Sequence, residues 1–162
     1  MEIRPAIPED AEAIAAIYSA GVAERLATFQ AEPLEPAAFG ARIAASETFL
    51  VALRDGAVIG VAWVSDYDPV HDYYSGVGEV TVYVAPPARR TGAGRALLEG
   101  VCAEAASRGR HKLLAKIFSG NDPSLALFSA CGFREVGTHR RHGQLGGEWK
   151  DVVVVERLLT SD

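Results

Sequence analysis

Short apolar runs at a strand-like spacing alternate along this chain with longer stretches at a helical spacing. Apolar side chains three and four positions apart predict helices after Pro8, over residues 35–45, between Gly92 and Gly109, and over residues 123–131. Alternating or continuous apolar runs predict seven strands, at residues 3–4, 48–53, 57–65, 79–84, 112–118, 133–140 and 148–158. Because strands and helices interleave, we expect an α/β domain built on one mixed sheet.

Turn-forming residues separate these runs where the backbone must reverse or stop. Asp55-Gly56 joins two strand-like runs and is the strongest short hairpin motif in the chain, so these strands should pair antiparallel. Pro86 and Pro87 end the fourth strand, because proline cannot donate a ladder hydrogen bond. A polar loop over residues 66–78 holds the ring-bearing side chains Tyr67, His71, Tyr73 and Tyr74. Loops of this kind carry function more often than stability.

The composition is that of one globular domain covering residues 1–162. Hydrophobic residues make up 49% and charged residues 23%, without a linker or an internal repeat. A formal net charge of -5 argues against a nucleic-acid partner. No apolar run approaches the ~20 residues that span a bilayer, and no secretory core follows Met1, which favours a cytoplasmic protein without membrane contact. Cys102 and Cys131 are expected as free thiols, and no metal-ligand spacing is found.

A turn rich in arginine and glycine connects the fourth strand to the longest predicted helix. It follows Val82-Tyr83-Val84 and reads Arg89-Arg90-Thr91-Gly92-Ala93-Gly94-Arg95. At such a helix start several free N–H groups point at one spot, the glycines let a phosphate approach closely, and the arginines add attraction. The turn therefore predicts a pyrophosphate site, with an ordinary capped helix start as the alternative. It lacks the Gly-Lys-Ser/Thr ending of a P-loop, and no dinucleotide motif follows the first strand.

With Asn121-Asp122-Pro123-Ser124 opening the next helix and Gly132-Phe133 after it, the chain resembles the GCN5-related N-acetyltransferase (GNAT) superfamily. Through residues 79–84, 142–143 and 149–152 it is most similar to the phosphinothricin and arsinothricin N-acetyltransferase branch. The resemblance implies the GNAT fold, a single mixed, mostly antiparallel sheet of about seven strands flanked by about four helices. It also implies acetyl-coenzyme A (acetyl-CoA) as cosubstrate and a homodimer.

The resemblance further implies where the cosubstrate lies. Its pyrophosphate is expected on the main-chain amides of residues 89–95, with Asn121 and Ser124 nearby. The main-chain groups of Val82 and Val84 are expected to pair with the pantetheine arm. A main-chain N–H in the Tyr83-Val84 region would then meet the negative charge that develops on the thioester oxygen.

Acetyl transfer requires a neutral amine, so some group must take a proton from the acceptor's ammonium. Glu79 begins the strand beside the expected cosubstrate and corresponds to the proposed general base of the branch; a solvated glutamate at a strand end is the alternative. Phe128 stands where many relatives have a tyrosine or histidine that serves the leaving thiolate. Phenylalanine cannot donate a proton, so we expect the thiolate to leave unassisted or with another group's help.

Two loops are expected to bind the acceptor. Phe29, His71 and Tyr74 lie in segments that correspond to the acceptor-binding loops of the branch, although an exposed loop position is an equal alternative for His71. The branch often has arginine in place of His71, where it holds an acidic acceptor. The missing positive charge is available from Lys116, Arg140 or Arg141.

The sequence thus predicts an acetyl-CoA-dependent N-acetyltransferase that acts on the amine of a small amino-acid-like molecule. The expected acceptor class is an antimetabolite such as arsinothricin, phosphinothricin or a methionine sulfone or sulfoximine analogue, which acetylation would detoxify. One alternative is a protein or peptide N-acetyltransferase. Another is a regulatory module that binds coenzyme A with weak or no catalysis, which the phenylalanine at position 128 would allow.

Overall fold

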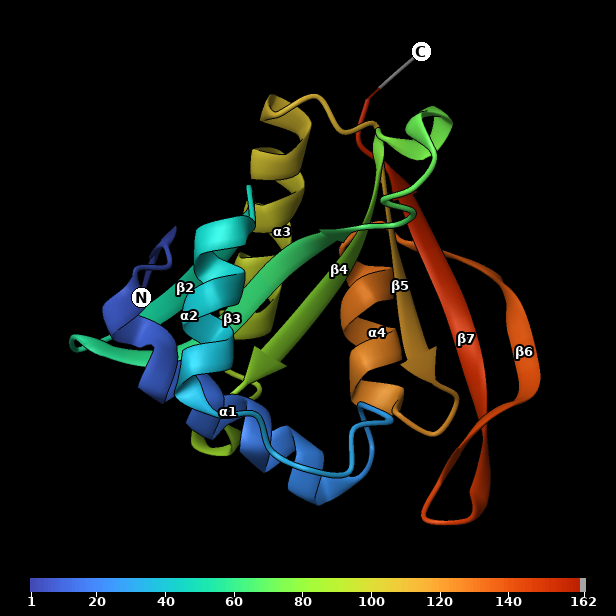
Figure 1. The fold of residues 1–162 in the computed structure, drawn as a ribbon, viewed down its shortest axis with the longest axis horizontal. Coiled ribbons are helices and arrows are strands. Elements are labelled where there is room, and N and C mark those ends of the chain that lie inside the picture. The colour runs from blue at the N-terminus through green and yellow to red at the C-terminus, as the bar shows by residue number, and fades with distance from the viewer. Residues whose placement is uncertain (161–162) are drawn as a thin grey trace.

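The computed structural model describes residues 1–160, which form one seven-stranded sheet with helices on both faces (Figure 1). The strands follow the order β1-β2-β3-β4-β5-β7-β6 across the sheet. Every neighbouring pair is antiparallel except β4 and β5, which are parallel. The strands are β1 (Glu2–Pro5), β2 (Phe49–Arg54), β3 (Ala57–Asp66), β4 (Val77–Val84), β5 (Lys112–Phe118), β6 (Arg134–Leu145) and β7 (Glu148–Leu158). The predicted mixed, mostly antiparallel sheet is confirmed.

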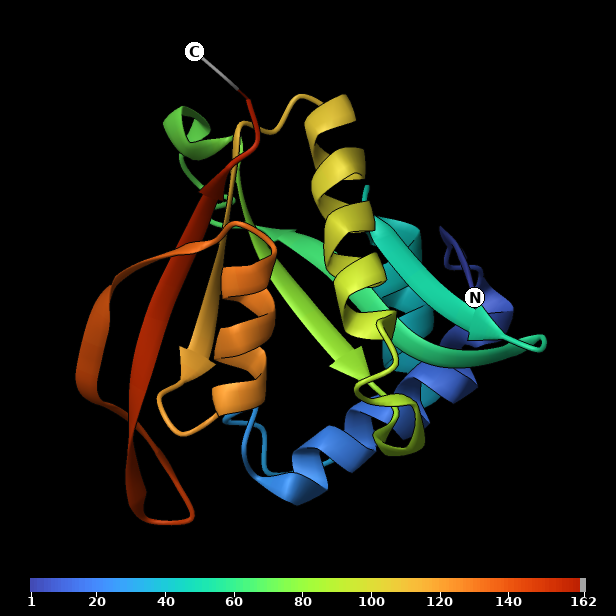
Figure 2. The ribbon, with the colours of Figure 1, turned by 180° about the vertical axis from the view of Figure 1, so that it is seen from behind.

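Four helices cover the sheet, two on each face (Figures 1 and 2). Leu97 and Val101 of α3 are fully buried on one face, and Ile14 of α1 and Phe39 of α2 are fully buried on the other. These side chains recur at the helical spacing that the sequence displays, which explains why each helix presents one apolar stripe to the sheet. Among the described residues no helix is both long and apolar enough to cross a bilayer. The helices are α1 (Ala11–Glu24), α2 (Pro36–Ala45), α3 (Ala93–Ser107) and α4 (Asp122–Ala130).

The helices on the α1 and α2 face cover only half of the sheet. Their buried cluster contains residues of β2 and β3, among them Val51 and Trp63, with Tyr83 of β4 packed against it, but none of β5, β6 or β7. In Figure 1 the half of the sheet that carries β5, β7 and β6 accordingly has no helix in front of it. A separate small cluster, Phe118, Leu145 and Val152, lies at the far end of this half. Polar side chains can therefore stand on this part of the sheet in contact with solvent.

The turns follow the sequence closely, whereas one strand does not. Asp55 and Gly56 both have positive φ, 52° and 79°, as a two-residue hairpin requires. Residues 133–140 were expected to form the sixth strand, but β6 continues to Leu145. Its register shifts between His139 and Gly143, so the strand resumes after a bulge. Because β6 is an exposed edge strand, it shows no apolar alternation that would reveal its full length.

Candidate active site

The parallel strands β4 and β5 are paired at one end only. Val77 to Glu79 of β4 face Lys112 to Leu114 of β5, and no pairing follows beyond Glu79 and Leu114 in the described sheet. β4 continues along β3 as far as Val84, and β5 continues along β7 as far as Phe118. The two strands thus diverge and leave a wedge-shaped gap in the sheet, through which α4 is visible in Figure 1.

Main-chain groups of β4 face this gap. Ala85 donates its N–H to the carbonyl of Ile59 in β3, at 2.9 Å. Since successive residues of a strand direct their main-chain groups to opposite edges, Val82 and Val84 turn theirs away from β3 and toward the gap. Tyr83 turns its own toward β3. The sequence predicts that a main-chain N–H of Tyr83 or Val84 meets the thioester oxygen of the cosubstrate. Of these two residues, only Val84 turns its N–H toward the gap.

The tyrosine side chain belongs to the core. Its ring lies 5.1 Å from the ring of Tyr18 and 6.2 Å from that of Trp63, measured between centroids. Burial is the main reason that the pKa of Tyr83 rises to about 12. The phenol therefore stays protonated and serves packing.

The arginine- and glycine-rich turn begins α3, as predicted. Gly92 is the N-cap residue with φ of 89°, a conformation that a side chain would strain. The first N–H groups of the helix, beginning at buried Ala93, have no acceptor within the helix. A Cβ atom at Gly94 would lie 3.1 Å from Leu127 and 3.6 Å from Val84, so this glycine lets α3 begin close to both α4 and β4. Thr91 folds its hydroxyl back onto the carbonyl of Ala88. The turn thus has the free donors and the space that a pyrophosphate needs.

The three arginines of the turn differ in their partners. Arg89 donates two hydrogen bonds to Glu24 of α1, at 2.6 and 2.8 Å, which raise the pKa of the guanidinium and lower that of the carboxyl. Its Nε also donates to the carbonyl of Val84, at 3.2 Å. Arg95 is paired with Glu99. Arg90 is exposed and forms no ion pair within the described residues, so it is the arginine whose charge is least neutralised.

Asn121 connects the far side of the gap to the loop that follows α1. Its Oδ1 accepts the N–H of Ser124 at 3.3 Å and so caps α4. Its Nδ2 donates to the carbonyl of Leu26, also at 3.3 Å. Asn121 therefore holds the start of α4 and the α1–α2 loop together at the open end of the gap.

An ion pair stands at the closed end. Lys116 of β5 lies 3.3 Å from Glu79 of β4, measured from Nζ to Oε2, and their side chains are 49% and 30% exposed. Lys116 projects from the half of the sheet that α1 and α2 leave uncovered, and Glu79 stands at its border, on the adjacent strand β4. The sequence identified Glu79 as the candidate base and Lys116 only as one of three possible cations, because no local pattern links residues so far apart in the chain.

Phe29 is the only predicted acceptor residue whose contacts reach the open half of the sheet. Its ring packs edge-on against Phe118 of β5, with centroids 4.7 Å apart. A Cβ atom at Gly143 of β6 would lie 2.7 Å from the same ring. Phe29 thus bridges β5 and β6 and closes one side of the region around Lys116.

His71 and Tyr74 belong instead to a cluster within their own loop. Nδ1 of His71 forms a hydrogen bond with Oδ2 of Asp68, at 2.7 Å, and this bond lowers the pKa of the Asp68 carboxyl. Its ring stacks on Tyr73, which contacts Tyr74, which in turn contacts Tyr67. The structure therefore groups these two residues with each other rather than with Phe29.

Phe128, which was predicted to supply no proton to the leaving thiolate, is part of the core. Phe128 of α4 is 3% exposed, and its ring meets that of Phe133 edge-on at 5.0 Å. Arg140 and Arg141, the other possible cations, lie exposed in the bulge of β6, where the N–H of Arg141 donates to Asp151 at 2.8 Å.

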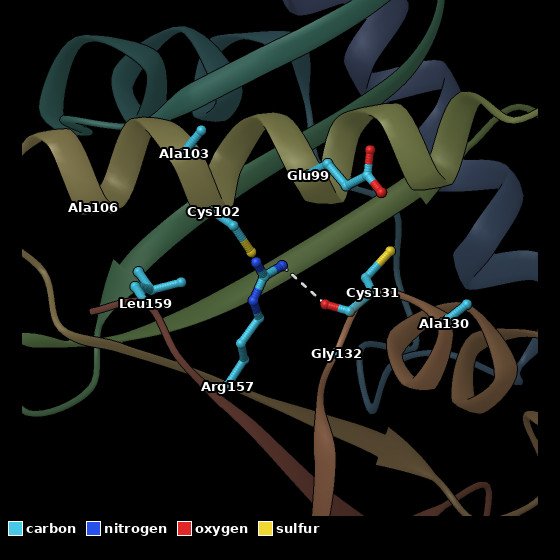
Figure 3. A pocket seen from close by; sticks show the side chains of 9 residues that line it. All are labelled: Glu99, Cys102, Ala103, Ala106, Ala130, Cys131, Gly132, Arg157 and Leu159. Carbon is cyan, nitrogen blue, oxygen red and sulfur yellow. Dashed lines mark hydrogen bonds between the residues drawn. The ribbon is translucent and has the colours of Figure 1, made fainter. Parts of the chain in front are cut away.

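A separate cavity of about 470 Å³ lies between the later parts of α3 and α4 and the end of β7 (Figure 3). Arg157 crosses it and donates to the carbonyl of Cys131 at 2.9 Å. Cys102, also in its wall, is a free thiol whose pKa burial raises to about 11. None of the predicted site residues lines this cavity, so it is distinct from the gap between β4 and β5.

Comparisons with known proteins agree with this geometry. The sequence profile of the Acetyltransferase (GNAT) family matches residues 14–133. Phosphinothricin N-acetyltransferase of Alcaligenes faecalis is 35% identical, over 98% of this chain and 83% of that protein. L-methionine sulfoximine/L-methionine sulfone acetyltransferase of Pseudomonas paraeruginosa is 33% identical, over 97% of this chain and 94% of that protein.

Solved structures show the same architecture. The acetyltransferase yncA from Salmonella typhimurium, solved with its cofactor acetyl-CoA, superposes with a TM-score of 0.95 at 29% identity and covers 100% of this chain and 95% of its own. Ribosomal-protein-alanine N-acetyltransferase from Brucella melitensis superposes with a TM-score of 0.93 at 33% identity, covering 98% of this chain and 99% of its own. The chain therefore belongs to the GNAT acetyltransferase family and is an N-acetyltransferase with acetyl-CoA as its cosubstrate.

Proposed function

We propose that this enzyme acetylates the α-amine of a free amino-acid-like antimetabolite, of the phosphinothricin, arsinothricin or methionine sulfone and sulfoximine type, and so detoxifies it. The observation that carries the proposal is the partly exposed carboxylate of Glu79 at the closed end of the gap, beside the half of the sheet that no helix of the α1 and α2 face covers. The names of the phosphinothricin and methionine sulfone relatives support this acceptor class.

The residues around the gap fit acetyl-CoA. Free N–H groups at the start of α3 and the uncrowded backbone at Gly92 suit its pyrophosphate, with the charge of Arg90 nearby. The outward-facing main-chain groups of Val82 and the N–H of Val84 are available to the pantetheine arm, whereas the carbonyl of Val84 already accepts from Arg89. Asn121 and Ser124 are proposed to border the gap from α4. Bound there, acetyl-CoA supplies the acetyl group as an activated thioester.

Glu79 is proposed as the group that takes a proton from the acceptor's ammonium. A carboxylate attracts the ammonium and accepts its proton directly or through water, which leaves the neutral amine that acetyl transfer requires. The N–H of Val84 faces the gap but lies ~17 Å along the strand from Glu79, so the outward-facing N–H of Val82 is the nearer donor toward developing negative charge. Phe128 offers no proton, and a thiolate is a stable enough leaving group to depart without a dedicated acid.

Acceptor contacts are proposed from two loops. Phe29 closes the region around Lys116 and provides an apolar surface for an acceptor side chain. The loop with His71 and Tyr74 leads directly into β4, two residues before Glu79, and is proposed to border the acceptor from that side.

An acceptor panel tests the proposed function. Release of coenzyme A would be measured with phosphinothricin, L-methionine sulfone, L-methionine sulfoximine and the common amino acids, alongside a peptide that begins with alanine. We expect the highest kcat/KM among the free amino-acid-like compounds. Preference for the peptide would instead establish the protein N-acetyltransferase alternative, and binding of coenzyme A without turnover of any amine would establish a regulatory module.

We also propose that residues 1–162 act as a single catalytic domain in the cytoplasm and assemble as a homodimer. Free Cys102 and Cys131 agree with a reducing compartment. The unpaired outer edge of β6 and the 52% exposed Trp149 offer a surface for a second copy. Light scattering of the purified protein measures the mass directly.

A further inference from the structure

We propose that Lys116 binds the carboxylate of the acceptor, so that the site selects α-amino acids over amines that lack a carboxylate. This inference rests on the proposed function and names the residue that would determine its specificity.

Lys116 occupies an unusual position for a lysine. β5 lies between β4 and β7 in the middle of the sheet, and Lys116 is its one exposed residue, since Lys112 is half-buried and the other five are buried. A charged side chain is tolerated in such a strand only where nothing covers it. The half of the sheet without α1 and α2 provides this opening.

The row of residues that starts at Lys116 ends in a glycine. Lys116 pairs with Val154 of β7, which pairs with Gly137 of β6. A Cβ atom at Gly137 would meet no other atom within 4 Å, so the β6 end of this row is open. On one side Phe29 and Phe118 form an apolar wall. A small molecule can therefore reach the lysine from the uncovered side of the sheet.

The ion pair is complementary to a zwitterion. Glu79 and Lys116 lie 3.3 Å apart and together carry no net charge. An acceptor with only an ammonium group is attracted by Glu79 but repelled by Lys116. An α-amino acid carries its ammonium and carboxylate on one carbon, so it satisfies both side chains at once. Lys116 has three donors and is half exposed, which leaves donors available for a carboxylate.

A second lysine provides a matched control. Lys112 lies on the same strand and the same face, but its Nζ bonds Glu156 at 3.0 Å, and Glu156 is also bound by Arg134. The hydrogen bond from Lys112 is the main cause that lowers the pKa of Glu156. Lys112 is therefore paired with Glu156 on β7, away from the gap, whereas Lys116 is paired with Glu79 at the gap.

The test compares an amino acid with its carboxamide. Steady-state kinetics would be measured for Lys116→Met, Lys116→Arg and Lys112→Met with L-methionine sulfone and L-methionine sulfone carboxamide, or with the best amino acid of the panel and its amide. Because the two amines differ in basicity, the quantity to compare is the acid-to-amide ratio of kcat/KM in each variant. We expect Lys116→Met to lower this ratio by about ten- to a hundredfold, mainly through a higher KM for the acid.

Lys116→Arg should keep most of the discrimination, and Lys112→Met should leave the ratio at its wild-type value. The KM for acetyl-CoA should stay unchanged in all three variants, which shows that each is folded. Equal turnover of acid and amide by the wild type, or an equal loss of both in Lys116→Met, would overturn the role of Lys116 while the proposed function stands. If the wild type acetylates no free amino acid, both ideas are wrong.

Discussion

Replacing Glu79 by glutamine tests the proposed proton transfer most directly. Glu79 is the last residue of β4 that pairs with β5. The substitution keeps the size and position of its side chain but removes the carboxylate that faces Lys116. Loss of a general base costs about a hundredfold or more in rate, which corresponds to about 2.7 kcal/mol of transition-state stabilisation. Binding of acetyl-CoA should be nearly unaffected, because Glu79 is separated from Val84, near the pyrophosphate turn, by ~17 Å of strand.

The pH dependence distinguishes the possible roles of this carboxylate. Alkaline solution supplies more free amine, so the deficit of Glu79→Gln should shrink as pH rises from neutral. Glu156→Gln is the matched control, because Glu156 flanks Leu114 from β7 as Glu79 does from β4, but is held by Lys112 and Arg134. A wild-type rate for Glu79→Gln at neutral pH would refute the proton-transfer role. An equal deficit at every pH would assign the carboxylate an electrostatic or binding role instead.

Three further predictions concern the cosubstrate, the leaving group and the fold. Gly92→Asp should strongly weaken the affinity for coenzyme A measured by calorimetry, because it strains a residue with φ of 89° and places a negative charge beside the phosphate. Gly92→Ala is the control that measures the strain alone. Unchanged affinity in a folded Gly92→Asp variant would contradict the proposed pyrophosphate site. Phe128→Tyr should keep or raise kcat, since phenylalanine contributes no proton; an inactive but folded variant would show that packing governs this position. Asp10→Asn should lower the free energy of unfolding at pH 7 by about 1.5–3 kcal/mol, because the carboxylate accepts two hydrogen bonds from Arg4. These bonds hold the pKa of Asp10 below its ordinary value of 3.8. The carboxylate's contribution to the free energy of unfolding is therefore present above that pH and disappears as pH falls through the lowered pKa. Denaturant unfolding at pH 7 and pH 3 should show that the difference in unfolding free energy between variant and wild type shrinks in acid.

Features encoded locally could be predicted from the sequence. The Asp55-Gly56 hairpin and the glycine turn before α3 each depend on a few adjacent residues whose backbone preferences are strong, and both occur as expected. Contacts between distant segments could not be predicted in this way. The Glu24 partner of Arg89 is 65 residues away, and no spacing rule links the two.

The acceptor loops show the same limit. Phe29 reaches β5 and β6 because the α1–α2 loop is tied to α4 by Asn121, a tertiary contact that the sequence does not display. His71 lies in the other predicted acceptor loop, and there its partner is Asp68 of the same loop. Position along the chain identified both residues, whereas only the fold determines which of them faces the open half of the sheet.

The gap between β4 and β5 has a consequence for the stability of the unliganded enzyme. A diverging pair leaves two strand edges inside one sheet without their ladder partners, and unpaired edges are the usual templates for association between chains. In the proposed binding mode the pantetheine arm takes the place of the absent ladder partner. Acetyl-CoA should therefore raise the melting temperature with the logarithm of its concentration, and at a hundred times its Kd it should add about 2.7 kcal/mol of stability. The same occupancy should slow aggregation on storage, which makes the cosubstrate a structural component of the resting protein as well as a reactant.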